Sequence, residues 1–348
     1  MAFTTINNPS DYFNTLLYTG TGSAQSLTGV GFQPDLVWLK DRTTGTTDHL
    51  VQDVIRGATY NLRTNTTNAQ DLSTGNVTSF DSDGFSLGTG GYANASGDNF
   101  VSWNWLADNT SGSSNTDGSV TSTVSANTTS GFSIVKYTAT GSVSTIGHGL
   151  GEVPKLIIVK NLAQAIDWVS YHSALGATKN IRLNTTDPVD TSSSIWNDTA
   201  PTSSVFTVGT SALSNGTGND LIAYCFAEKQ GFSKFGSYVG NGSSTSGAFI
   251  YLGFRPAFVL LKNTTTLGYS WPITDNKRET SNDGANSVIW ANRDYAEDTN
   301  TYDMNLLSNG FKINSTSNNF NKNGDTYIYI AFAEQSLVTS NGLPSNAR

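Results

Sequence analysis

One pattern of Gly, Pro and Lys occurs three times in this chain, and it limits the possible folds more than any other feature. Each copy begins with Gly, has Pro three residues later, and continues through a mostly apolar run to a Lys. The copies are GFQPDLVWLKD (31–41), GEVPKLIIVKN (151–161) and GFRPAFVLLKN (253–263). A Tyr that opens a Gly-rich turn precedes each copy, at Tyr18, Tyr137 and Tyr238. Repetition on this scale indicates one structural unit used three times.

Further matches follow each copy in the same order. The run GATYNLRTNTT (57–67) corresponds to GATKNIRLNTT (176–186), and the third copy has diverged there. Each copy ends with what we call its closing strand: FVSWNWLA (100–107), LIAYCFAE (221–228) and YIYIAFAE (327–334). The predicted organisation is three repeated domains, a flexible Ser- and Gly-rich linker between the first two, and a polar tail. The predicted boundaries are 1–108, linker 109–119, 120–230, 231–337 and tail 338–348.

Side chains in the closing strands alternate between large and small. Trp103, Tyr224 and Ile330 fall on the large face, and successive strand residues point to opposite faces. The large face is therefore expected to fill a core, and Cys225, on the small face, is interpreted as a small buried filler. The large face consists of Val101, Trp103 and Trp105 in the first closing strand, Ile222, Tyr224 and Phe226 in the second, and Ile328, Ile330 and Phe332 in the third.

The strands that follow each proline are apolar on both faces, which is typical of strands buried on both sides. Many short strands separated by Gly, Asn, Asp and Ser turns complete the pattern. The sequence therefore predicts an all-β fold of three tandem, divergent β-sandwich or jelly-roll-like domains with little helix. At most short helical turns are expected, near 48–56 and 166–175.

Composition narrows the functional classes. Only 13% of residues are charged and the net charge is −8, with no cluster of Lys and Arg. A nucleic-acid partner is not expected, because binding phosphates requires such a cluster. The first residues lack the basic and apolar parts of a secretory signal, and no apolar run approaches the ~20 residues that cross a bilayer. We therefore expect synthesis in a host cytoplasm without a signal peptide, and no membrane insertion.

Candidate catalytic and metal-binding residues do not form a recognisable set. The histidines, His49, His148 and His172, have no counterpart in all three copies. Neither a G-x-S-x-G nucleophile turn nor a phosphate-binding loop occurs. The acidic turn DSDG (81–84) resembles a calcium loop, but the other copies lack its acids, so a hairpin turn is favoured. The prediction is no catalytic residue, no metal and no cofactor.

Two other sets of residues keep their place between copies. Asp53 and Asp275 both follow their prolines by the same interval, and the same count puts Ser173 there in the second copy. A structural loop contact is the preferred interpretation over acid–base catalysis. A Lys ends each post-proline strand, and a contact that maintains the fold is preferred over a ligand role; these are Lys40, Lys160 and Lys262.

Four tryptophans lie outside the repeated strands and are the candidate glycan contacts, because aromatic rings on loops can stack on sugars. They are Trp168, Trp196, Trp271 and Trp290. The alternative is that these rings are partly buried packing residues.

The combined motifs resemble a known family. FTTINNPSDYF, GFQPDLVWLK followed by DHLVQDVIRGAT, GHGLGEVPKLIIVKN, and GFSKFGSYVGNG through GFRPAFVLLKN to YIYIAFAE are similar to a repeated domain of unknown function. That domain recurs in tail-fibre-like and other virion structural proteins of tailed bacteriophages, mostly of marine bacteria. The resemblance spans nearly all of the chain and implies a virion protein without known catalytic residues. The third copy departs from the pattern around 276–289.

Three functions remain open. The first is a structural protein of the virion exterior, such as a tail fibre or other appendage, with head decoration as the alternative position. It would bind other virion proteins and form a homo-oligomer. The second, compatible with the first, is an adhesin for a host surface glycan. The third is an enzyme such as a depolymerase, which the sequence does not favour.

Overall fold

The structure is a computed structural model that describes residues 4–279, 282, 286–302, 304–338 and 342. It is mostly β, with several sheets and none closed, which confirms the predicted β-rich class. Helical residues in the described part of the chain form three single turns and one 3-10 turn. These are α1 (Gly91–Asn94), α2 (Ser193–Trp196), α3 (Ala212–Asn215) and η1 (Pro9–Asp11).

Three groups of four antiparallel strands share one strand order, and we call them the central sheets of the first, second and third segments (1–108, 120–230 and 231–337). The first is β1 (Phe13–Thr19), β9 (Asn99–Trp105), β3 (Leu36–Asp41) and β4 (Leu50–Asp53). The second is β12 (Phe132–Thr138), β19 (Asp220–Ala227), β14 (Pro154–Asn161) and β15 (Val169–His172). The third is β20 (Ser233–Val239), β28 (Thr326–Ser336), β22 (Phe254–Asn263) and β23 (Pro272–Asp275).

Additional strands extend two of the central sheets. The second sheet continues beyond β12 into β11 (Ser122–Asn127) and β10 (Ser113–Asn115), and beyond β15 into β16 (Lys179–Arg182) and β17 (Asp190–Thr191). The third continues beyond β23 into β24 (Asn286–Trp290) and β25 (Asp298–Tyr302). In the first segment β5 (Tyr60–Asn61) and β6 (Asp71–Leu72) form a separate pair.

A smaller outer sheet accompanies each central sheet. The outer sheets are β2 (Gln25–Thr28), β8 (Gly84–Leu87) and β7 (Val77–Asp81); β13 (Ser144–Gly147) and β18 (Val205–Val208); and β21 (Phe249–Tyr251), β27 (Gly310–Ile313) and β26 (Met304–Leu307). In the first segment Val37 and Leu39 pack with Phe85 and Leu87 in one cluster between the two sheets. The second segment has a comparable cluster that includes Ile157, Cys225 and Phe206.

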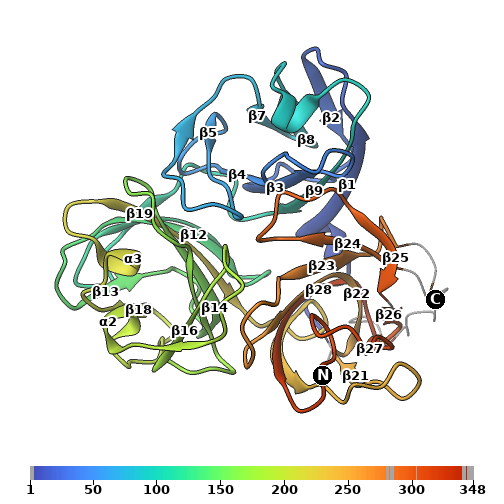
Figure 1. Ribbon diagram of the computed structural model, residues 1–348. Coiled ribbons are helices and arrows are strands. Elements are labelled where there is room, and N and C mark those ends of the chain that lie inside the picture. The colour runs from blue at the N-terminus through green and yellow to red at the C-terminus, as the bar shows by residue number, and fades with distance from the viewer. Residues whose placement is uncertain (1–3, 280–281, 283–285, 303, 339–341, 343–348) are drawn as a thin grey trace.

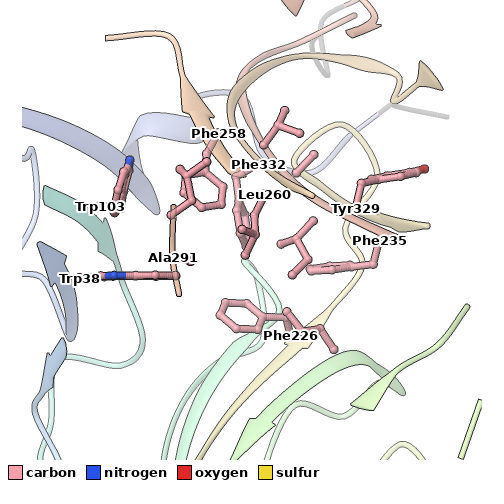
Figure 2. Close-up of a cluster of buried hydrophobic side chains, with 14 of the residues drawn as sticks. Trp38, Trp103, Phe226, Phe235, Phe258, Leu260, Ala291, Tyr329 and Phe332 are labelled. Carbon is pink, nitrogen blue, oxygen red and sulfur yellow. The ribbon is translucent and has the colours of Figure 1, made fainter. Parts of the chain in front are cut away.

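The opposite faces of the three central sheets pack against one another in one shared core, as Figure 1 shows for the three lobes around a common centre. The closing strands β9, β19 and β28 place Trp105, Phe226 and Phe332 at corresponding register positions. Their ring centroids lie 6.4 Å (Trp105–Phe226), 5.6 Å (Trp105–Phe332) and 5.6 Å (Phe226–Phe332) apart. Figure 2 shows part of this cluster.

This arrangement explains the sequence pattern of the central strands. Every residue of β3 is buried, as are the residues that follow Lys155 in β14. These strands are covered on one face by an outer sheet and on the other by the shared core, so both faces must be apolar. The large faces of all three closing strands belong to the shared core, so the prediction that this face fills a core is confirmed.

The shared core joins all three segments, in addition to the clusters that the first and second segments bury between their own two sheets. Rings from different segments touch directly: Phe13 stacks on Phe332 with centroids 5.2 Å apart, and Trp103 meets Phe258 at 5.7 Å. An apolar cavity of about 40 Å³ remains among Leu36, Trp105, Phe226 and neighbouring buried side chains. Sequence alternation shows that a face is buried but does not name the partner that covers it.

Local differences from the sequence predictions are small. The predicted flexible linker at 109–119 contains β10, which pairs with β11 and is therefore part of a sheet. The ranges 48–56 and 166–175, where at most short helical turns are expected, contain β4 and β15. Each strand is followed by one hydrogen-bonded turn, closed by a bond from Gly57 N–H to Asp53 O (2.9 Å) or from Gly176 N–H to His172 O (3.2 Å). The divergent region at 276–289 lies partly, and the tail at 338–348 almost wholly, outside the described residues.

Candidate functional site

Polar side chains at matching positions lie where the three segments meet, and this set is the candidate functional site. The first position immediately precedes the strand beside each post-proline strand and holds His49, Trp168 or Trp271. Their backbone N–H groups all donate to an Asn side chain further along the same segment. The acceptors are Asn65 (3.0 Å), Asn184 (2.9 Å) and Asn292 (2.9 Å). The same local contact therefore holds each of these three residues.

The side chains at this position reach into another segment. Trp168 Nε1–H donates to Arg63 O of the first segment at 2.8 Å, and Trp271 Nε1–H donates to Arg182 O of the second at 3.1 Å. His49 Nε2 lies 3.0 Å from Trp290 O of the third. The three contacts connect the first segment to the third, the second segment to the first, and the third segment to the second. Together they close a ring of segments.

A second position carries a buried carboxylate in two segments. Asp53 Oδ2 accepts bonds from Arg56 Nε at 2.6 Å and from Tyr224 OH of the second segment at 2.7 Å. Asp275 Oδ2 accepts from Arg278 Nε at 2.6 Å and from Trp103 Nε1 of the first segment at 2.9 Å, so the arrangement at Asp53 is repeated. Both carboxylates are fully buried. Each accepts hydrogen bonds from the guanidinium of an Arg in its own segment and from a side-chain donor of another segment.

The second segment has His172 at this position, which corrects the alignment to Ser173. Strand register decides the matter, because Leu36 pairs with Asp53 and Leu156 pairs with His172. His172 Nε2 bonds to Tyr329 O of the third segment at 3.2 Å. Counting residues from Pro154 misses this correspondence, because the second segment is one residue shorter between its proline and β15. The predicted role of Asp53 and Asp275, a structural contact, agrees with the bonds they make.

Burial and neighbouring charge set the protonation of these groups. Burial would lower the pKa of the Arg56 guanidinium, but the adjacent Asp53 carboxylate outweighs burial and raises it. Burial lowers the pKa of His172 to about 4, with the bond to Tyr329 O opposing that shift, and holds the pKa of His49 well below its usual value. The Arg56 guanidinium therefore stays charged and the two histidines are neutral near pH 7.

Hydrogen bonds define the histidine tautomers. The indole N–H of Trp38 can only donate, and it lies 2.9 Å from His49 Nδ1. Nδ1 therefore accepts, and Nε2 carries the proton that it donates to Trp290 O. His172 repeats this pattern, since its Nδ1 accepts from Ala174 N–H at 3.2 Å. Both side chains are committed to structural hydrogen bonds.

The Lys that ends each post-proline strand is also buried and bonded to loop carbonyls. Lys160 Nζ donates to Ile166 O (2.7 Å), Thr67 O (3.0 Å) and Gln164 O (3.2 Å), so it also links the second segment to the first. Lys40 Nζ donates to Asp41 O at 2.6 Å and Lys262 Nζ to Tyr269 O at 2.5 Å. Burial lowers the pKa to about 8 for Lys40 and Lys160 and about 7 for Lys262. These contacts agree with the interpretation of the three lysines as residues that maintain the fold.

The four candidate glycan contacts lie inside the protein. Trp168, Trp196, Trp271 and Trp290 are only 1%, 1%, 2% and 7% exposed. Because these rings are buried, none of them can stack on a sugar at the protein surface. The sequence marks them correctly as lying outside the repeated strands, but it does not show that a neighbouring segment covers Trp168 and Trp271. Exposed aromatic rings occur elsewhere: Tyr60, Tyr92, Phe249, Tyr251 and Tyr295.

The remaining sequence candidates have structural contacts. Both carboxylate oxygens of Asp83 in the acidic turn accept backbone bonds, from Gly29 N–H at 3.0 Å and Gly31 N–H at 2.7 Å. Cys225 is buried, and burial raises the pKa of its thiol. Within the ranges that the structure describes, no three His, Cys, Asp or Glu side chains are grouped to hold a metal ion, and none of the helices could span a bilayer.

Comparison with known proteins gives one kind of match. The family model of a domain of unknown function (DUF7483) matches residues 8–336. No curated protein and no solved structure matches the chain.

Proposed function

We propose, from the premise that this chain belongs to the DUF7483 family of domains of unknown function, that it is a structural protein of a tailed phage particle. It would be an external component without catalytic activity, most simply part of a tail fibre or appendage. The sequence motifs that resemble virion proteins direct the proposal to a phage, and the contacts between segments support a structural role.

The finer architecture belongs to the same proposal. We propose that the three segments are copies of one β-sandwich domain of jelly-roll-like type, arranged about an approximate threefold axis through the closing strands. Three observations support it: the common strand order, the matched register, and the ring of corresponding contacts. A closed ring of like units within one chain resembles the interfaces of a symmetric oligomer.

The observation that carries the structural role is how the matching polar groups are used. The Asp–Arg pairs, the three lysines and Trp168 and Trp271 are buried, and they bond to backbone groups or to another segment. A catalytic carboxylate or base needs access to a substrate, whereas these groups are enclosed. They are suited to locking three segments into one rigid body.

Immunogold labelling of intact, purified particles tests the position. Gold on the tail supports an appendage. Gold over the head would instead favour a decoration protein, and particles without gold would contradict the virion role. Contact with other virion proteins and homo-oligomerisation are parts of the proposal, and crosslinking of intact particles followed by mass spectrometry tests them.

A glycan-binding role is the second candidate, and exposed tyrosines favour it. The ring of Tyr92 is 42% exposed with the Arg63 guanidinium 5.6 Å from its centre, and Tyr295 is 53% exposed beside Arg293 at the same distance. Binding of the purified protein to host surface polysaccharide, lost in Tyr92→Ala or Tyr295→Ala, would support it. Release of saccharide in the same assay would point to a depolymerase and contradict the non-catalytic proposal.

A further inference from the structure

The strands β1, β12 and β20 occupy the same place in their central sheets but differ at the outer edge. Each pairs with the closing strand of its segment on one side. On the other side β12 pairs with β11 over six residues, from Ser122 opposite Tyr137 to Asn127 opposite Phe132. In the described residues β1 and β20 have no partner strand on that side. The covered edge of β12 is therefore a template for what the other two edges could accept.

The unpaired groups of β1 can be identified from the ladder. Gly20 N–H bonds to Asp98 O at 2.8 Å and Leu106 N–H bonds to Tyr12 O at 3.0 Å, so the even-numbered residues face β9. Alternate residues of an antiparallel strand point to opposite sides, so the N–H and C=O groups of Leu17 point to the open edge. The Leu17 side chain is 37% exposed. A strand beside β1 would find this edge accessible.

A glycine decides whether there is room for the added strand. In the second segment a Cβ built on Gly149 would lie 2.9 Å from Val124 Cγ1 and 3.3 Å from Ala126 Cβ, both on β11. The absence of a side chain there makes space for β11. The matching residue of the first segment, two before the Gly of the repeated motif, is Gly29, and a Cβ built on it meets nothing within 4 Å. The first segment therefore keeps the same space, unfilled.

The third segment blocks the equivalent edge with side chains. Tyr251 stands where the other segments have Gly29 and Gly149, with Lys234 Nζ 5.8 Å from its ring centre. The N–H of Phe235, which points outward, donates to the carboxylate of Glu228 at 3.2 Å. Long side chains that cover the edge are a common protection against unwanted strand pairing. In β1 the outward N–H of Thr15 also has a side-chain acceptor, Asn14 Oδ1 at 3.0 Å. The two edges differ because Gly29 stands where β20 has Tyr251 nearby, so the space over β1 is the more open.

We infer that the edge of β1 binds an extended strand of a different protein, not β1 of a second copy, antiparallel and in the register that β11 has on β12. The bound strand would place a small or β-branched side chain opposite Leu16, as Val124 lies opposite Val135, and a very small one opposite Asn14, as Ala126 lies opposite Ser133. Backbone hydrogen bonds would supply affinity, and the space over Gly29 would supply the preference for small side chains. This inference does not depend on the virion role.

A fluorescein-labelled peptide with the sequence of residues 119–128, which includes β11, is the probe for the full chain. Fluorescence anisotropy is expected to show saturable binding with one site per chain. Leu17→Pro removes an outward N–H that makes no bond to β9, and the peptide should bind this variant at least about tenfold more weakly, the equivalent of ~1.4 kcal/mol. The matched control is Ser237→Pro, the same change at the same place on β20, which should leave binding unchanged.

A peptide variant keeps the test independent of folding. Ala126→Tyr within the peptide puts a large side chain over Gly29 and should abolish binding to the unaltered protein. Failure of the parent peptide to bind, or equal binding to Leu17→Pro, would overturn the inference. A dimer of the protein alone that Leu17→Pro dissociates in sedimentation would also overturn it, because two β1 edges would then pair with each other.

Discussion

The contact between the first and second segments and the contact between the second and third use the same strand positions with different chemistry. In the first, Tyr224 OH donates to Asp53, which is also bonded to Arg56. In the second, His172 replaces the aspartate and bonds to a backbone carbonyl, and Ile330 holds the position that corresponds to Tyr224. Where one segment has a carboxylate at this position, the facing segment has a side-chain donor. Where the carboxylate is replaced by His172, the donor is replaced by Ile330.

This difference shows that the buried polar groups belong to complementary sets. An isolated buried charge is costly, and a buried donor without an acceptor costs about 1–3 kcal/mol. If Ile330 were Tyr, its hydroxyl would find no carboxylate at His172. If Tyr224 were Ile, the Oδ2 atom of Asp53 would lose one of its two donors. In each contact, therefore, the buried donors match the buried acceptors.

The largest expected effect is at the ionic contact. Asp53→Ala leaves the Arg56 guanidinium buried without its carboxylate and Tyr224 without its acceptor. The free energy of unfolding should fall by about 4–5 kcal/mol, the upper range for breaking a buried ion pair. Urea denaturation measures this loss. Ser173→Ala, beside the histidine of the other contact, is the control and should change stability by less than about 0.5 kcal/mol.

A second substitution tests whether the two contacts share one core. Phe226→Ala removes a ring that touches Trp105 and Phe332 in the other segments. We expect a loss of about 3–4 kcal/mol, typical of deleting a buried aromatic ring. Calorimetry should still show a single transition, shifted as a whole. Two transitions, with only one of them shifted, would mean that the segments unfold separately and that the shared core does not couple them.

The histidine contact should make stability depend on pH. Burial lowers the pKa of folded His172 to about 4, below the ~6.5 expected in the unfolded chain. Between these values the unfolded state binds more protons, so stability is full above pH 6.5 and falls as the pH decreases. His172 should account for about 2 kcal/mol of loss between pH 8 and 5. His172→Gln should flatten that part of the curve, and an unchanged slope would show that His172 is not the group responsible.

The smallest expected effect isolates one hydroxyl. Tyr224→Phe keeps the ring in the core and removes the bond to Asp53, so stability should fall by about 1.5–2 kcal/mol, the usual value for a hydrogen bond to a charged group. In an Asp53→Ala background the same change should cost much less, because the acceptor is already gone. Additive losses in this double-mutant cycle would contradict the coupling.

Much of the fold could be predicted from local patterns. Alternation along the closing strands identifies the buried face that holds Trp103 and Phe226, and the apolar runs after Pro34 and Pro154 identify strands buried on both sides. These patterns are readable because each reflects which face of a single strand meets water. The prediction of a flexible linker at 109–119 is wrong, because its polar residues include the edge strand β10, which pairs with β11. A polar composition suits an edge strand as well as a linker, because one side of the edge strand remains in water.

The contacts between segments could not be predicted in this way. Counting residues from Pro154 places the matching position one residue too late, at Ser173, because only the pairing with Leu156 defines the register of His172. The sequence predicts Trp168 and Trp271 as candidate surface rings, but their indole groups bond to carbonyls of other segments. A side chain that meets a distant part of the chain carries no periodic signal in its own neighbourhood.

The sequence by itself determined the β-rich class and the large faces of the closing strands, because hydrophobic alternation along a strand is a local property. Only the tertiary structure decided that these faces meet in one core, that Asp53 and Asp275 bond to another segment, and that β11 covers the edge of β12 while β1 has no partner strand there among the described residues. Each of those outcomes depends on how sheets distant in sequence pack together, which is set by three-dimensional shape rather than by the pattern of any one strand.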